Sequence, residues 1–176
     1  MQNPKVKQQE KKLIEGFEVW REARKIEEFE FPGLPYVMLH SLSHLLITAV
    51  SLDAGYSASA IQERIYAGDY GYGILLYTGT TGSGGTLGGL VQLGNRIEQH
   101  LTMALEMGQL CSNDPVCSQH IPSNPHEQRF LHGAACHGCL LISESSCEQR
   151  NAFLDRTLLV DTVDTFGVGF FSETHR

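Results

Sequence analysis

The five cysteines of this chain constrain its fold more than any other feature, because they fall within a single stretch of irregular sequence. They stand at Cys111, Cys117, Cys136, Cys139 and Cys147. Residues 111–146, which carry the first four and end just before Cys147, contain three prolines and are poor in apolar side chains. A segment of this composition builds little core of its own, but a bound metal can organise it in place of a core.

The cysteine spacing favours zinc over the other common uses of cysteine. Four thiolates satisfy the tetrahedral geometry of Zn²⁺ at sulfur–zinc distances of about 2.3 Å, and closed sites of this kind are structural. A thioredoxin-like C-x-x-C pair would open a helix directly after a strand, whereas the residues before Cys136 show no clear strand pattern. Free buried thiols are the other alternative. We therefore predict a structural zinc site.

Three of the predicted zinc ligands are Cys136, Cys139 and Cys147. The first two form the C-x-x-C pair, which supplies two ligands from one tight turn. Residues 145–148 have the spacing of a capping box, so a helix is expected to start at about Cys147 and to run to Asp155. A helix N-terminus favours a thiolate, which suits Cys147 as a ligand.

The fourth ligand is either Cys117 or Cys111. We prefer Cys117 because the turn expected at residues 113–115 presents it, which leaves Cys111 at a helix end as a core residue. The predicted set is therefore Cys117, Cys136, Cys139 and Cys147. Lesser candidates are the nearby histidines His120, His132 and His137.

Length and composition indicate an ordinary globular protein. The chain has 176 residues, of which 41% are hydrophobic and 19% charged, as expected for one soluble domain. Residues 1–12 are charged and lack the apolar stretch of a secretory signal, and the number of cysteines is odd. Both features favour reduced thiols and a cytoplasmic location without a membrane partner.

Basic residues are concentrated near the N-terminus. Residues 1–30 hold seven Lys and Arg beside seven acidic residues, whereas residues 31–176 hold six arginines, no lysine and thirteen acidic residues. A surface that follows a phosphate backbone needs clustered cations. The composition therefore argues against a broad nucleic-acid interface, and any such contact would be secondary, through Arg129, Arg150 or Arg156.

The residue pattern predicts a mixed α/β (α+β), helix-rich fold with a loop-rich zinc-binding segment. Residues 5–30 should form an amphipathic helix with Leu13, Phe17 and Trp20 on one stripe. This helix either packs on its own domain or docks to another subunit. Residues 32–35 break the pattern, so we expect an N-terminal helix over 1–30 and a single zinc-binding domain over 31–176.

The body of the chain should alternate helices with short strands. The expected elements are a buried helix over 36–54, a short helix over 59–66, a buried strand over 73–78, a helix from about 87 to 107, a helix over 147–155 and a last strand over 157–163.

Two further motifs support an alternative function, an enzyme of hydrolase type. Residues 79–86 form a glycine-rich loop between a strand and a helix, but Gly85 occupies the position where a phosphate loop carries lysine. His40 and His44 are four residues apart on one helix face, without the glutamate of H-E-x-x-H between them. We favour a packing role for both and predict no catalytic residue. The alternative enzyme would use the loop with His40/His44 or a free cysteine.

Five blocks of the sequence resemble the C-terminal zinc-binding domain of the DrmB family, a helicase-partner subunit of DISARM antiphage defence. That domain is similar to the zinc-binding domain of MrfA-type DNA-repair helicases. The resemblance covers roughly residues 35–165. The blocks are LHSLSHLLI (39–47), GYSASAIQERIYA (55–67), GILLYTGTTGSGGTLGGLV (73–91), CSNDPVC (111–117) and LHGAACHGCLLISESSCEQRNAFLDRTLLV (131–160).

This resemblance implies zinc on the cysteines and an accessory role beside a superfamily 2 helicase, rather than an activity of the chain itself. We expect the partner to be a helicase or nuclease subunit of a defence complex. Cys136, Cys139 and Cys147 match the cysteines of the family motif. Cys111 and Cys117 both match as well, so the resemblance leaves the fourth ligand open. Members of the family are usually much longer than this chain.

Overall fold

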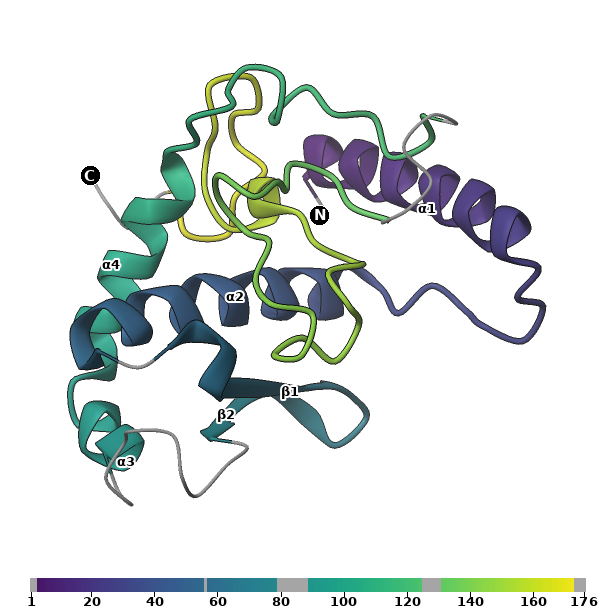
Figure 1. Cartoon of the computed structure of the whole chain (residues 1–176). Coiled ribbons are helices and arrows are strands. Elements are labelled where there is room, and N and C mark those ends of the chain that lie inside the picture. Colours follow the sequence, from purple (N-terminus) through teal and green to yellow (C-terminus); the bar gives the residue numbers. More distant parts are fainter. Residues whose placement is uncertain (1–2, 56, 79–88, 125–130, 173–176) are drawn as a thin grey trace.

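A long buried helix, α2 (Leu34–Ala54), organises the fold, and the other elements pack around it (Figure 1). The computed structural model describes residues 3–55, 57–78, 89–124 and 131–172. Within these ranges the chain forms a mixed α+β structure, as the sequence predicts. The other elements are α1 (Pro4–Arg24), the 3-10 helix η1 (Ala58–Ala60), β1 (Ile61–Gly68), β2 (Gly71–Thr78), α3 (Gly89–Gly94), α4 (Ile97–Gln109) and the 3-10 helix η3 (Arg156–Leu158).

The sequence sets both ends of α2. Gly33 precedes the helix with a φ of 85°, and Pro35 occupies its first turn, where the missing N–H costs no hydrogen bond. Gly55 ends the helix in the left-handed conformation, with a φ of 67°. The stretch Leu34–Asp53 is long and apolar enough to cross a membrane, but 67% of its most apolar window is buried inside the fold. It therefore serves as the core helix of this structure.

Side chains of α2 contribute to three hydrophobic clusters, one for each neighbouring part of the fold. Leu42, Leu45 and Leu46 pack against α4 and the C-terminal loops. Val37 joins a cluster that includes side chains of α1. Ile47 packs with Ile61 of β1 and with α3. Each flank of α2 is thus covered by a different part of the chain.

The apolar stripe of α1 faces the interior of its own domain. Leu13 is 1% exposed and Phe17 is 2% exposed, and both pack with Phe153 of the C-terminal segment. Trp20 lies edge-on to Phe153 with ring centroids 5.5 Å apart. Of the two roles expected for this stripe, the structure therefore shows packing on the chain's own domain. The residues that would have docked to another subunit are covered by the chain itself.

The prediction of a helix over residues 59–66 is wrong. Only Ala58–Ala60 form a helical turn, and the chain then enters β1, which pairs with β2 in an antiparallel hairpin. Ile61, Glu63 and Ile65 are buried while the residues between them are not, so the burial pattern has the period of two that strands show. The alternation of buried and less buried residues over 61–65 therefore indicates the strand that the structure contains.

The predictions of two elements near the C-terminus are also wrong. Residues 147–155 form turns instead of a helix, and Arg150, Asn151 and Phe153 have positive φ values between 51° and 63°. Such values interrupt the right-handed helical conformation. Residues 157–163 form no strand, because η3 and loop backbone occupy this part of the chain. Most of this segment is buried, and its apolar side chains pack in the core. Its sequence therefore resembles that of a central strand although the backbone does not form one.

The strand expected over 73–78 is present as part of β2, but the prediction that it is buried is wrong, because every residue of β2 is exposed or half-buried. The other helices hold with shifted boundaries. The helix expected between about 87 and 107 is divided into α3 and α4. The glycine-rich loop of residues 79–86 lies outside the described residues.

Candidate metal centre

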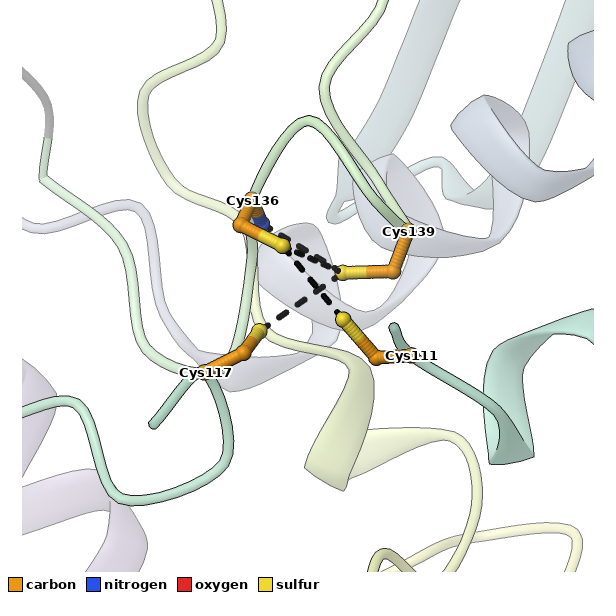
Figure 2. A group of neighbouring side chains, drawn as sticks. All are labelled: Cys111, Cys117, Cys136 and Cys139. Carbon is orange, nitrogen blue, oxygen red and sulfur yellow. Dashed lines mark hydrogen bonds between the residues drawn. The ribbon is translucent and has the colours of Figure 1, made fainter. Parts of the chain in front are cut away.

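Four thiols converge at one point on the side of the fold where α4 ends. Cys111, Cys117, Cys136 and Cys139 have sulfur atoms that all lie within 4.8 Å of one another. Figure 2 shows the four side chains pointing inward toward a common centre, from three separate stretches of backbone. Cys117 is buried and the other three are half-buried. The group is thus shielded but close to the surface.

The sulfur–sulfur separations fit a tetrahedral metal ion. They are 3.4 Å between Cys111 and Cys136, 3.7 Å between Cys117 and Cys139, and 3.7 Å between Cys136 and Cys139. A regular tetrahedron of thiolates about 2.3 Å from zinc has sulfur–sulfur edges of about 3.8 Å. A disulfide would bring two sulfurs to about 2.05 Å. The four sulfurs are therefore not paired in disulfides, and the donor set and its spacing suit zinc.

Short turns place the thiols. Cys111 follows the end of α4, and the turn after it is closed by hydrogen bonds from Asp114 N to Cys111 O (3.1 Å) and from Cys117 N to Asn113 O (3.0 Å). The C-x-x-C turn is closed by hydrogen bonds from Cys139 N (3.1 Å) and Leu140 N (3.0 Å) to Cys136 O. The turn at 113–115 thus presents Cys117, as the sequence predicts, but it also brings Cys111 into the group.

Amide groups surround the sulfur atoms as donors. Asn113 N donates to Cys111 Sγ (3.4 Å), Gly138 N donates to Cys136 Sγ (3.3 Å), and Cys136 N donates to Cys139 Sγ (3.3 Å). Such bonds orient thiolate ligands and stabilise their charge. Gly138 packs closely against this turn, since a Cβ atom there would lie 2.8 Å from Ser112 Oγ and would require that hydroxyl to shift.

A buried arginine lies next to the thiols. Arg156 is completely buried, donates to Gly108 O (3.0 Å), and pairs with Asp114 in the turn before Cys117. The pKa of Cys139 is lowered to about 5 by a hydrogen bond from Cys117 and, to a smaller extent, by the charge of Arg156, although burial opposes this shift. The same hydrogen bond raises the pKa of Cys117. Burial raises the pKa of Cys111 to about 11.

Cys147 does not lie with the other predicted ligands. The structure brings Cys117, Cys136 and Cys139 together as expected, but their fourth neighbour is Cys111. Cys147 lies instead among His40, His44 and Glu63. The helix expected after Cys147 is absent, and the turn that replaces it directs the thiol toward α2.

The second group of four is more deeply buried than the first. Burial raises the pKa of the Cys147 thiol to about 12 and lowers the pKa of His44. Burial alone would raise the pKa of Glu63, but hydrogen bonds with His40 and His44 lower it well below its usual range. The i, i+4 spacing of the two histidines indicated a shared face, but no local pattern connected them with Glu63.

The remaining candidate residues have other surroundings. His120 and His132 pack against each other with ring centroids 4.6 Å apart and ring planes inclined by 35°, and His137 is exposed in the C-x-x-C turn. The expectation of nucleic-acid contact is wrong for Arg156, because that side chain is buried and ion-paired. Arg150 is exposed, and Arg129 lies outside the described residues.

Comparison with known proteins agrees with this geometry. The model of the MrfA Zn-binding domain matches residues 42–140, a range that contains all four clustered thiols. The chain belongs to the MrfA Zn-binding domain family. It is also 42% identical, over 172 residues, to the DISARM protein DrmB of Bacillus paralicheniformis. The aligned region covers 97% of this chain but only 30% of that relative, so the chain corresponds to less than a third of the longer protein.

Proposed function

We propose that Cys111, Cys117, Cys136 and Cys139 bind one structural Zn²⁺ ion. The observation that carries this proposal is the convergence of four thiols at the separations of a zinc tetrahedron. When bound, the metal would supply a crosslink between the end of α4, the turn that follows it and the C-x-x-C turn. The membership of the MrfA Zn-binding domain family supports zinc as the metal.

We further propose that the zinc site is not catalytic. Four cysteine ligands fill the coordination shell of zinc, whereas catalytic sites keep one position for water or substrate. The alternative enzyme would need His40 and His44 to meet a substrate, but both side chains are completely buried. The module would therefore serve as an accessory part of a DISARM-type defence complex, a role supported by its similarity to DrmB.

Metal analysis tests the proposed zinc site. Protein purified without chelator should contain zinc, and Cys136→Ser should lose one zinc per chain. Ser145→Ala, which changes an exposed residue between Cys139 and Cys147, should retain the wild-type content. A chelator should lower the melting temperature of the wild type, because the binding energy of structural zinc contributes to folding. Wild-type protein without zinc would contradict the proposal.

We propose that the outer face of the β1–β2 hairpin contacts a helicase or nuclease subunit. Register pairs Tyr66 with Gly73, Arg64 with Leu75 and Gln62 with Tyr77, so Tyr66, Leu75 and Tyr77 share the face opposite Ile61, Glu63 and Ile65. These three side chains are 52%, 47% and 41% exposed. Exposed tyrosines are enriched in protein interfaces, and the acidic composition of the body disfavours nucleic acid there.

A binding assay with a purified DISARM helicase subunit tests this surface. The double variant Tyr66→Ser/Tyr77→Ser should weaken binding at least tenfold, because aromatic anchors carry much of the energy of an interface. Val91→Ser removes an apolar side chain of 75% exposure from α3 and should leave binding unchanged. Equal affinities of the wild type and the hairpin variant for the helicase subunit would show that the hairpin is not part of the interface.

A further inference from the structure

Four metal-binding side chains meet in the core at a second place, remote from solvent. His40 and His44 come from successive turns of α2, Glu63 from β1 and Cys147 from the C-terminal loops. Their exposed fractions are 0%, 0%, 3% and 6%. One ligand atom from each lies within 4.8 Å of all the others.

Both histidines aim the same ring nitrogen at this point. His40 Nδ1 lies 3.1 Å from Phe153 O, and His44 Nδ1 lies 2.8 Å from Leu140 O. A carbonyl oxygen can only accept a hydrogen bond, so each Nδ1 must carry the proton. In the neutral ring, Nε2 is then an acceptor with its lone pair directed into the cluster. This arrangement is the usual one for metal-binding histidines, in which the second nitrogen is anchored by an outer hydrogen bond.

The inward-facing atoms are therefore mostly acceptors. Glu63 Oε1 lies 2.8 Å from His40 Nε2 and 3.2 Å from His44 Nε2, and Cys147 Sγ lies 3.1 Å from His40 Nε2. Acceptors this close repel one another unless a proton or a cation lies between them. Protonating both imidazoles would bury two cations against a single carboxylate, which is costly in a dry core. One divalent cation would satisfy all four groups at once.

The charges of such a site balance. Two neutral imidazoles, one carboxylate and one thiolate carry a total charge of about −2, which a divalent ion neutralises. The part of the chain that the structure describes places no lysine or arginine in hydrogen-bond contact with Glu63; its other partners there are Ser43 Oγ and Glu148 N.

Backbone groups also prepare Cys147 for a negative charge. Its sulfur accepts hydrogen bonds from Asn151 N (3.1 Å) and Gln149 N (3.4 Å). The left-handed residues Arg150 and Asn151 shape this turn, so their uncommon backbone conformation directs the two donors toward the thiol. Two amide donors aimed at one sulfur are typical of a metal-bound thiolate.

We infer that His40, His44, Glu63 and Cys147 bind a second metal ion, and that this ion is zinc. Nitrogen, oxygen and sulfur ligands in a set of four suit Zn²⁺, and soft thiolate excludes Mg²⁺ and Ca²⁺. Four protein ligands and complete burial define a closed, structural site. It would join α2, β1 and the C-terminal loops, three parts of the chain that the thiol cluster does not connect in this way.

Metal stoichiometry tests the second site on the full chain. Wild-type protein loaded with zinc and then desalted should retain two zinc ions per chain. His40→Gln and Cys147→Ser should each retain one. His100→Gln is the matched control, because His100 is a buried histidine of α4 that pairs with Asp53 outside both clusters, and this variant should retain two.

X-ray absorption at the zinc edge on the wild type decides the question even if the variants fail to fold. Two occupied sites predict an average shell of about 2.5 sulfur and 1.5 nitrogen or oxygen atoms per zinc. One zinc per chain with four sulfurs would overturn the second site while leaving the thiol site intact, and the histidine cluster would then be a hydrogen-bonded network only. One zinc with a single sulfur and three lighter ligands would support the second site and remove the thiol site.

Discussion

The ion pair between Arg156 and Asp114 should couple the stability of the core to the thiol cluster. The Arg156 side chain is completely buried, and that of Asp114 is 9% exposed. Replacing Arg156 with Met keeps the length of the side chain but removes its hydrogen bond to the Gly108 carbonyl and leaves the Asp114 carboxylate without its counter-charge, with Ser118 N as its donor. Removing one partner of a buried ion pair costs about 3–5 kcal/mol. We therefore expect Arg156→Met to lower the free energy of unfolding by about that amount.

A double-mutant cycle isolates the interaction from the loss of packing. Asp114→Asn alone should also destabilise the fold, because it leaves the guanidinium buried without its counter-charge. Once the arginine is absent, the same change should cost much less, so the two changes should show a coupling energy of about 1–3 kcal/mol. Arg150→Met, at an exposed arginine of the same C-terminal segment, is the control and should change stability by less than about 0.5 kcal/mol.

The assay is urea unfolding in zinc-saturated buffer, so that every variant starts from the same metal content. A chelator-competition measurement on the same samples should show faster zinc release from Arg156→Met. Four thiolates and one Zn²⁺ leave a net charge of about −2, which a nearby guanidinium offsets. Additive effects within 0.5 kcal/mol, together with an unchanged release rate, would refute a coupled role for Arg156.

Three further predictions concern other parts of the fold. Gly16→Ala should destabilise by about 1–3 kcal/mol in thermal unfolding, because the new Cβ would lie 2.4 Å from Pro122 Cβ, whereas Gly94→Ala meets nothing within 4 Å and should be close to neutral. Phe17→Ala should cost about 3–5 kcal/mol in urea unfolding, against under 0.5 kcal/mol for Leu52→Ala at a 69% exposed site. A hydrogen bond from His100 lowers the pKa of Asp53 below its ordinary value of 3.8. The contribution of the ionised Asp53 to the free energy of unfolding is therefore present above pH 3.8 and is lost as the pH falls through the lower pKa of the folded state. Asp53→Asn should therefore lower the unfolding midpoint at pH 7, and its difference from the wild type should shrink in acid; a difference that stays constant with pH would contradict this origin.

The sequence predicted the helical frame because helix ends and apolar stripes are local signals. Pro35 and Gly55 set the limits of α2, and Leu13, Phe17 and Trp20 marked the buried side of α1. The class of the fold followed from the same reasoning. What the stripe packs against is a long-range property, so sequence reasoning left two alternatives for α1.

The prediction of a helix over residues 147–155 is wrong because several residues there adopt the left-handed backbone conformation. Ser145 and Glu148 have capping-box spacing, but the positive φ values of Arg150, Asn151 and Phe153 turn the chain instead of coiling it. None of these three residues is glycine, so the composition carried no sign of the turn. This turn directs Cys147 away from the other three predicted ligands, and Cys111 lies with them instead.

The two clusters are linked through the residue that follows the C-x-x-C turn. Leu140 donates its N–H to Cys136 O, inside the thiol cluster, and accepts a hydrogen bond from His44 Nδ1 at its own carbonyl. Since Leu140 is also completely buried in the core beside α2, its backbone cannot shift without disturbing both clusters. Zinc at the thiol cluster would therefore hold the His44 ring in the orientation that the second metal requires. Loss of the first ion should then weaken binding of the second, so Cys136→Ser should lower the zinc affinity of the second site as well as abolish the first.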